Sequence, residues 1–390
     1  MSDQSLKPST RLLRAGRPHL GWVNTPVTRA STYVFDSVAN WRETRLNRES
    51  RRMVSYGARG TDSTHALEDA LVELEGGHRA QLFPTGHAAI ATLLLGLLSP
   101  GDHVVVTDAV YEPVRRFCSQ HLARFGVVVE YFLPDGSDLA DRLRPETRLI
   151  YTECPGSLAF EMMDLPAAAR LARRHGCLLA VDNTWGSGLL YRPLALGADI
   201  SVLAATKYLS GHADVMMGAI VSTERAWEAI QRASVGLGQT VGADDAYLVL
   251  RGMRSLIPRI EMHARHAMQV AGWLEAQPGV ARVLCPALPG DPGHRLWQRD
   301  CHGTNGLLSV EFEPGIPAKA VEAAIDRLQL FGIGASWGGF ESLALPVDMA
   351  AARSVADWSG HGPIMRLHVG LEDPGDLVAD LRQAFSALAP

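Results

Sequence analysis

Residues 177–214 read CLLAVDNTWGSGLLYRPLALGADISVLAATKYLSGHAD and contain two apolar segments, each followed by a polar residue. CLLAVD (177–182) and ISVLAA (200–205) are apolar almost throughout instead of alternating, which indicates strands covered on both faces, as in a mainly parallel sheet. Asp182 ends the first segment and Lys207 follows the second. Ligands of an open parallel α/β sheet bind beyond the carboxyl ends of its strands. Asp182 and Lys207 are therefore the first candidates for a functional site.

Short apolar segments alternate with helical patterns over most of the chain. Strands of a first sheet are predicted at 81–83, 103–107, 126–132, 148–153, 177–182, 200–205 and 215–221. An amphipathic stretch from Asp244 to about Gln277 crosses to a second domain. Strands of that domain are predicted at 281–286, 306–313, 330–336 and 364–372. The pattern predicts an α/β fold with a mainly parallel central sheet and a smaller C-terminal α+β domain.

The chain has 390 residues, which is long for a single domain. We expect an N-terminal arm over residues 1–55 that contributes to a subunit interface, a large domain over 56–250 and a small domain over 251–390. Acids interleave with the basic residues of Arg42–Arg52, so this segment of the arm is expected to be a solvated or subunit-contact face.

Composition argues against several classes of function. A formal net charge of −5 gives no reason to expect a nucleic-acid or membrane partner. The five cysteines are scattered without a CxxC pair, so neither a disulfide framework nor a zinc site is indicated. His263 and His266 lie three residues apart on a predicted helix without nearby acids, and we expect them at the surface, not at a metal. No signal pattern and no apolar run of ~18 residues is present, which predicts a cytoplasmic protein.

Three polar positions are ambiguous alone but indicate a cofactor site together. Asp182 is compatible with a helix cap, a ribose ligand or the partner of a protonated pyridine nitrogen. A lysine such as Lys207 is usually a surface residue, but a partly desolvated lysine amine is an effective carbonyl nucleophile. Thr85–Gly86 separates a strand from a helix beginning near His87, where free N–H groups favour a phosphate. An amine for an aldehyde, a carboxylate for a ring nitrogen and a phosphate cradle are the parts of a pyridoxal 5′-phosphate (PLP) site. No GxGxxG, P-loop, GxSxG or HExxH motif offers a competing interpretation.

Several longer motifs extend this interpretation to the whole chain. They include SYGARGTDSTHALEDALVELEGG (55–77), DNTWGSGLL (182–190), AATKYLSGHADVMMG (204–218), SWGGFESL (336–343) and MRLHVGLED (365–373). From about Thr10 to the C-terminus the chain resembles the cysteine and methionine metabolism family of fold-type I PLP enzymes, most closely its bacterial cystathionine β-lyases. SWGGFESL and the ATKY–GH–D pattern favour the β-lyase branch over the γ-lyase and γ-synthase branches.

The resemblance implies how the cofactor is held. Lys207 would form the Schiff base with PLP and later move protons, Asp182 would pair with the pyridinium nitrogen, and Tyr111 would stack on the ring. The phosphate would be bound by the backbone amides of Gly86 and His87, by Thr206 and, from the neighbouring subunit, by Tyr56. The implied catalytic residues are Lys207, Tyr111 and Tyr56. Because Tyr56 acts across an interface, we expect at least a homodimer, and the family often forms tetramers.

The resemblance also implies the substrate and the reaction. Arg366, with Ser336 and Trp337, would bind the α-carboxylate of an amino acid, since a guanidinium grips a carboxylate with two parallel hydrogen bonds. The expected reaction is α,β-elimination from cystathionine or a related thioether, giving a thiol, pyruvate and ammonia. Three alternatives stay open: a specialised relative acting on another amino acid, γ-elimination or γ-replacement on homoserine-derived substrates, and a PLP-binding protein without turnover.

Two positions depart from the family pattern. Ala58 stands where the family has an arginine that binds the phosphate, and Arg59 is the arginine that remains nearby. Ala335 stands where the β-lyases carry tyrosine, which predicts a wider and less polar substrate pocket on that side. We expect Ala58 to weaken cofactor retention unless Arg59 compensates.

Overall fold

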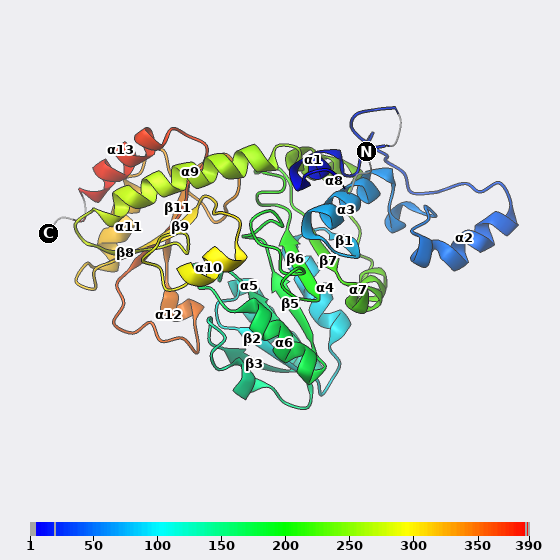
Figure 1. The fold of residues 1–390 in the computed structure, drawn as a ribbon, viewed down its shortest axis with the longest axis horizontal. Helices are drawn as coiled ribbons and strands as arrows, with labels where there is room; N and C mark the ends of the chain where they lie inside the picture. Colours follow the sequence, from blue (N-terminus) through cyan, green and yellow to red (C-terminus); the bar gives the residue numbers. More distant parts are fainter. Residues whose placement is uncertain (1–4, 19–20, 387, 389–390) are drawn as a thin grey trace.

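The computed structural model describes residues 5–18, 21–386 and 388, and shows two sheets bridged by one long helix (Figure 1). The large sheet has seven strands: β1 (Arg79–Phe83), β2 (His103–Thr107), β3 (Val128–Phe132), β4 (Thr147–Glu153), β5 (Leu178–Asp182), β6 (Ile200–Ala204) and β7 (Gly218–Ser222). Their order is β1-β7-β6-β5-β4-β2-β3. The β3, β2, β4, β5 and β6 strands are parallel to their neighbours in this series, whereas β7 is antiparallel to both β1 and β6. The predicted mainly parallel α/β sheet is confirmed.

Helices cover both faces of the large sheet. They are α3 (Asp62–Glu75), α4 (Gly86–Leu97), α5 (Glu112–Gln120), α6 (Leu165–His175), α7 (Glu224–Gly236) and α8 (Ala243–Met253). In β5, Leu179 and Val181 belong to the apolar core that includes α6, while Ala180 between them belongs to the core that includes α4. Successive strand residues point to opposite faces, so a strand buried on both faces is apolar throughout. This explains the continuous apolar segments of the sequence.

The second sheet has five strands: β8 (Val280–Leu284), β9 (Leu307–Phe312), β10 (Gly332–Ile333), β11 (Leu343–Val347) and β12 (Ile364–His368). It packs with α11 (Ala318–Asp326) and α13 (Pro374–Phe385) around a separate apolar core. The predicted strand over 330–336 is wrong in length, because only two of its residues pair. β11 was not predicted, and it contains Pro346, a residue that is unfavourable within a strand.

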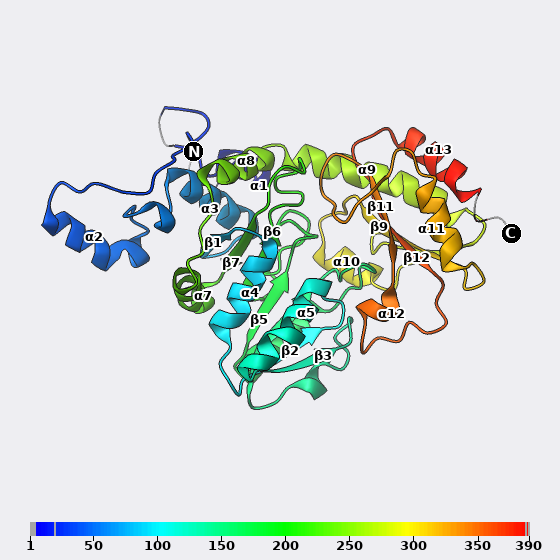
Figure 2. The ribbon, with the colours of Figure 1, turned by 180° about the vertical axis from the view of Figure 1, so that it is seen from behind.

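The predicted amphipathic stretch at 244–277 consists of two helices, α8 and α9 (Leu256–Glu275). The break lies three to four residues before Pro258, which has no N–H for a preceding turn and fits only the start of a helix. Leu256 and Ile260 pack into a core of the large sheet, and Val270 and Leu274 into the core of the small one. Figures 1 and 2 show α9 running from one sheet to the other. The α9 helix is therefore part of both cores.

The prediction that His263 and His266 lie at the surface is wrong. Both side chains are buried on α9, with 0% and 5% of their surface exposed. In a core position a neutral imidazole is stable when a backbone carbonyl accepts its proton, and His263 Nδ1 donates to the carbonyl of Val369 at 2.9 Å.

The N-terminal segment contains α1 (Pro8–Arg14), which packs on α3, and α2 (Val38–Arg51), which stands away from the body of the subunit in Figures 1 and 2. Large apolar side chains of this segment are exposed, including Trp22, Val34 and Leu46. The remaining short elements are the helical turns Gly57–Arg59, Leu122–Phe125 and Leu139–Arg142, α10 (His294–Asp300) and α12 (Met349–Ala352). All five cysteines are free thiols. Within the described ranges, no helix is long and apolar enough to cross a membrane, and no cluster of side chains is arranged to hold a metal ion.

Candidate active site

Asp182 and Lys207 lie at the carboxyl ends of two adjacent parallel strands, β5 and β6. The Asp182 side chain is buried, and its Oδ1 accepts hydrogen bonds from the backbone N–H and the hydroxyl of Thr184, at 3.0 and 2.6 Å. Burial raises the pKa of Asp182, while the bonds from Thr184 and the nearby charge of Lys207 act against that rise. A buried carboxylate in this position is suited to a cationic partner.

The Lys207 amine contacts the loop that joins β10 to β11 of the second sheet. Its Nζ donates to Ser336 Oγ at 2.7 Å and lies 5.2 Å from the centre of the Trp337 ring. Burial and the positive charge of Arg366 lower the pKa of Lys207 to about 8, although Asp182 acts in the opposite direction. A larger share of the amine is thus neutral near neutral pH than for an ordinary lysine, which favours nucleophilic attack on a carbonyl.

Arg366 lies in the middle of β12, and its side chain extends to the same loop, at Ser336. Its Nη2 donates to the carbonyl oxygen of Ser336 at 3.2 Å. With Trp337, Arg366 also lines a small cavity next to Glu153. The structure thus brings Lys207, Ser336, Trp337 and Arg366 together, although 129 residues separate Lys207 from Ser336.

The N-terminus of α4 lies against the end of β6. Thr85 caps this helix, with its hydroxyl accepting from the N–H of Ala88 at 2.9 Å. A Cβ atom at Gly86 would lie 2.8 Å from the Cβ of Ala204, so only glycine allows this approach. His87 follows, and its Nδ1 is buried without a hydrogen-bond partner among the described residues. The first N–H groups of a helix have no partner within it, and this end is therefore open to an anion.

The Thr206 hydroxyl, an expected phosphate ligand, already makes two hydrogen bonds to the backbone of Met217. The hydroxyl donates to the carbonyl of Met217 at 3.2 Å and accepts from the N–H of the same residue at 2.9 Å. A hydroxyl has a single hydrogen, so donation from Thr206 to a phosphate requires the bond to the Met217 carbonyl to be given up.

Tyr111 lies near the same group of residues, at the start of α5. Its backbone N–H donates to Glu153 Oε2 at 2.7 Å, and about half of its side chain is exposed. Burial, then the carboxylates of Glu153 and Asp182, raise the pKa of the Tyr111 hydroxyl. The hydroxyl is therefore a proton donor at neutral pH.

Sequence reasoning missed Glu153. It ends β4 and pairs in register with Asp182 at the end of β5. Burial, followed by the Asp182 charge, raises the pKa of Glu153 well above its ordinary value. The rule that selected Asp182, a polar residue ending an apolar strand, applies equally to Glu153 and was sufficient to find it.

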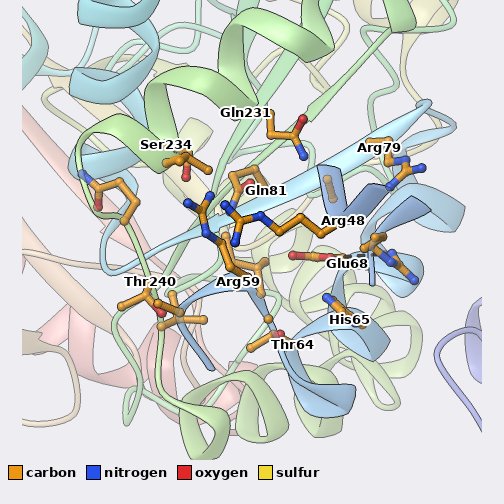
Figure 3. Close-up of a pocket in the computed structure, with 18 of the residues that line it drawn as sticks. Arg48, Arg59, Thr64, His65, Glu68, Arg79, Gln81, Gln231, Ser234 and Thr240 are labelled. Atoms are coloured by element: carbon orange, nitrogen blue, oxygen red, sulfur yellow. Dashed lines mark ion pairs between the residues drawn. The ribbon is translucent and has the colours of Figure 1, made fainter. Parts of the chain in front are cut away.

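Tyr56 and Arg59 do not lie with this group in one subunit. They line a separate cavity of about 310 Å³ between the arm, α3, β1 and α7 (Figure 3). Arg48 and Glu68 also line it, and burial raises the pKa of Glu68 to about 8. Lys207 is not among its lining residues.

The lysine and the aspartate at adjacent strand ends, with a helix N-terminus beside them, define a fold-type I PLP enzyme. The family model of the Cys/Met metabolism PLP-dependent enzymes matches residues 9–386, and the chain belongs to this family. The chain is 45% identical to a cystathionine beta-lyase of Bordetella avium and 41% identical to cystathionine beta-lyase MetC of Escherichia coli K12, in both cases over 100% of each chain. The crystal structure of metB from Corynebacterium glutamicum superposes with a TM-score of 0.89 at 29% identity, covering 100% of both chains. Recognition of the family from its motifs is confirmed, as is PLP as the cofactor.

Proposed function

We propose that this protein is a carbon–sulfur β-lyase that cleaves cystathionine, or a related thioether amino acid, with water to a thiol, pyruvate and ammonia. The observation that carries the proposal is the contact between Lys207 Nζ and Ser336 Oγ at 2.7 Å, beside Arg366. This contact brings the amine proposed to bind the cofactor, beside the large sheet, next to the residues proposed to bind the substrate carboxylate, on the small sheet and its loop. The full-length similarity to cystathionine beta-lyases supports the same reaction.

The residues present fit PLP. Lys207 would hold its aldehyde, the Asp182 carboxylate its ring nitrogen, and the N–H groups of Gly86 and His87 its phosphate. The buried Nδ1 of His87 without a partner and the close approach at Gly86 support the phosphate end. When bound, PLP supplies a carbonyl that joins the substrate amine and a ring that withdraws electrons from Cα.

The chain's own groups then account for binding and proton movement. The Arg366 guanidinium orients the α-carboxylate, with Ser336 and Trp337 beside it. Lys207 Nζ is the base for the Cα proton, because its lowered pKa lets it accept and return a proton near neutral pH. The Tyr111 hydroxyl is the donor for the departing sulfur, since its raised pKa keeps it protonated.

The region around Ala335 supports a broad choice of substrate. Ala335 is exposed and directly precedes the Ser336–Trp337 carboxylate group. A methyl group occupies less space than the tyrosine that the resemblance places there, and it has no hydrogen-bonding group. We expect thioethers of different length beyond the sulfur to be accepted.

The functional unit that we propose is at least a homodimer. Tyr56 and Arg59 line a cavity apart from Lys207 in their own subunit, and the exposed apolar residues of the arm call for a covering surface. A second copy that presents Tyr56 to the phosphate satisfies both observations.

The test is detection of keto acid and thiol with the purified holoenzyme and a panel of cystathionine, cystine, other thioethers and homoserine esters. Pyruvate and a thiol from cystathionine are expected, and the folded Lys207→Ala variant should release neither. Release of 2-oxobutyrate would instead establish γ-elimination. Absence of any keto acid would leave a PLP-binding protein without turnover.

A further inference from the structure

The loop Ser336–Glu341 joins β10 to β11 and lies directly on the backbone of Lys207. A Cβ at Gly338, whose φ is +88°, would lie 2.8 Å from the backbone nitrogen of Tyr208 and 2.9 Å from the carbonyl carbon of Lys207. The loop has no room to approach further. Its side chains at 336 and 337 therefore hold their positions over Lys207 only if the loop backbone is fixed.

His368 holds that backbone. It is fully buried on β12, two residues after Arg366 and so on the same face of the strand. Its Nε2 lies 3.0 Å from the N–H of Gly338, and its Nδ1 lies 3.1 Å from the carbonyl oxygen of Glu341. An N–H requires an acceptor and a carbonyl requires a donor, so the proton is on Nδ1 and Nε2 accepts. Both ring nitrogens are used on one loop.

The surroundings keep this imidazole neutral. Burial, then the neighbouring His263 and the charges of Arg366 and Lys207, lower the pKa of His368 to about 3. A second ring proton would face the N–H of Gly338 and break the contact. The acceptor at Nε2 is thus permanent over the whole physiological pH range.

We infer that His368 is a positioning residue that fixes the Ser336–Glu341 loop over Lys207 and thereby sets the grip on the substrate carboxylate. Ser336 transmits the effect, because its hydroxyl contacts Lys207 Nζ and its carbonyl accepts from Arg366. The expected effect of His368 on turnover rests on the proposed function. Its expected effect on the position of the loop does not.

His263 provides a matched control. It is equally buried, its ring centre lies 5.2 Å from that of His368, and both rings contact Tyr208. Its hydrogen bond goes to the carbonyl of Val369 and not to the loop. Loss of His263 therefore reports the cost of removing a buried histidine from this core without touching Gly338.

The experiment compares the holoenzymes of H368Q, H368N, H368L and H263L with the wild type. Hydrogen–deuterium exchange of the peptide containing Gly338 is measured together with kcat, KM for cystathionine and the unfolding temperature. Glutamine places an acceptor near the position of Nε2, whereas asparagine reaches only the position of Nδ1. We expect H368L and H368N to exchange faster and to raise KM about ten-fold, H368Q to stay within about three-fold of the wild type, and H263L to lower the unfolding temperature with KM unchanged.

Two results would overturn the inference: unchanged exchange and KM in H368N and H368L, or an equal rise of KM in H263L. If H368L does not fold, the contrast between H368Q and H368N decides, and equal values for the two would count against the role. If no variant and no wild-type protein cleaves cystathionine, the proposed function fails, while the exchange of the Gly338 peptide still decides whether His368 holds the loop.

Discussion

Lys207 is partly buried and lies near a guanidinium, and both conditions favour its neutral form. Because its pKa is lowered to about 8, the rate at which PLP reconstitutes the apoprotein should rise with pH and level off above about 8. In R366L the positive neighbour is removed, so the midpoint should move to higher pH. Absorbance of the bound cofactor in stopped-flow mixing measures the rate. R282L, which removes an arginine from another strand of the same small sheet, should leave the midpoint in place.

Asp182 is expected to dominate cofactor affinity among the side chains around the ring. An asparagine keeps the shape but cannot carry the charge that balances a protonated ring nitrogen. We expect D182N to bind PLP about 10- to 100-fold more weakly, the loss expected for a charge-assisted hydrogen bond. Titration of the apoprotein followed by absorbance measures the affinity, with T184A as the milder control. Wild-type affinity in D182N would exclude the assigned partner.

Ala58 removes one charge from the expected phosphate site. A guanidinium at this position would add a charge-assisted contact, so A58R should tighten PLP binding about ten-fold. The same titration applies. Unchanged affinity would mean that position 58 does not reach the phosphate in the assembled enzyme.

At the scale of helices and strands, the sequence predicted what local patterns determine. The 103–107 segment is β2 to the residue, β5 ends at Asp182 as predicted, and β6 ends at Ala204, one residue before its predicted end. What failed depends on contacts distant in sequence. β11 is held by its neighbours despite Pro346, and His263 is buried because α9 belongs to two cores.

In the candidate site, too, local patterns reveal some residues, whereas contacts between distant segments are not predictable from them. The strand-end rule finds Asp182, and it finds Glu153 when applied to every strand. No local pattern shows that Ser336 Oγ meets Lys207 Nζ or that His368 holds Gly338, because these contacts join separate sheets or distant loops. The family resemblance assigned Lys207 and Ser336 to one site without their contact, and it assigned no role to His368 or Gly338.

The contact between Asp108 and the segment 354–356 can be tested by measuring the stability of the protein. Asp108 follows β2 and is fully buried, and its carboxylate accepts from the backbone N–H groups of Ser354, Val355 and Ala356 and from Arg115. Although burial alone would raise it, these bonds lower the pKa of Asp108 to about 2. We expect D108N to reduce the free energy of unfolding by about 3 kcal/mol at pH 7, because asparagine has no charge, keeps only one acceptor oxygen and turns an NH2 group towards buried donors.

The pH dependence has a defined sign. A carboxyl whose pKa is lowered in the folded state stabilises it above its unfolded pKa of about 3.9, and that contribution is lost as the pH falls through the folded value of about 2. The difference between the wild type and D108N should therefore be full above pH ~5 and vanish towards pH ~2. Chemical denaturation at several pH values measures it. D348N, at the exposed cap of α12 in the same region, should change the free energy of unfolding by less than about 0.5 kcal/mol, because asparagine caps a helix as well as aspartate does.

At the scale of the whole molecule, a substitution in the N-terminal arm can test whether the arm forms the subunit interface. Leu46 on α2 is 83% exposed in one subunit. If a second copy covers it, L46D will bury a charge in the interface, dissociate the assembly and weaken PLP binding through loss of Tyr56. Light scattering after gel filtration, with PLP titration, measures both effects. L330D, an exposed leucine of the small domain, is the control, and identical behaviour of the two variants would exclude the arm as the contact.

The division of the site between two sheets has a consequence for how such enzymes diversify. The groups that we propose to retain the coenzyme stand on or beside the large sheet, those that we propose to bind the amino acid stand on the small sheet or its loop, and α9 packs in the cores of both. We therefore expect an exchange near Ala335 to alter which amino acid is bound and to leave the affinity for the coenzyme unchanged. One chemistry can in this way be directed to new substrates by remodelling a single domain.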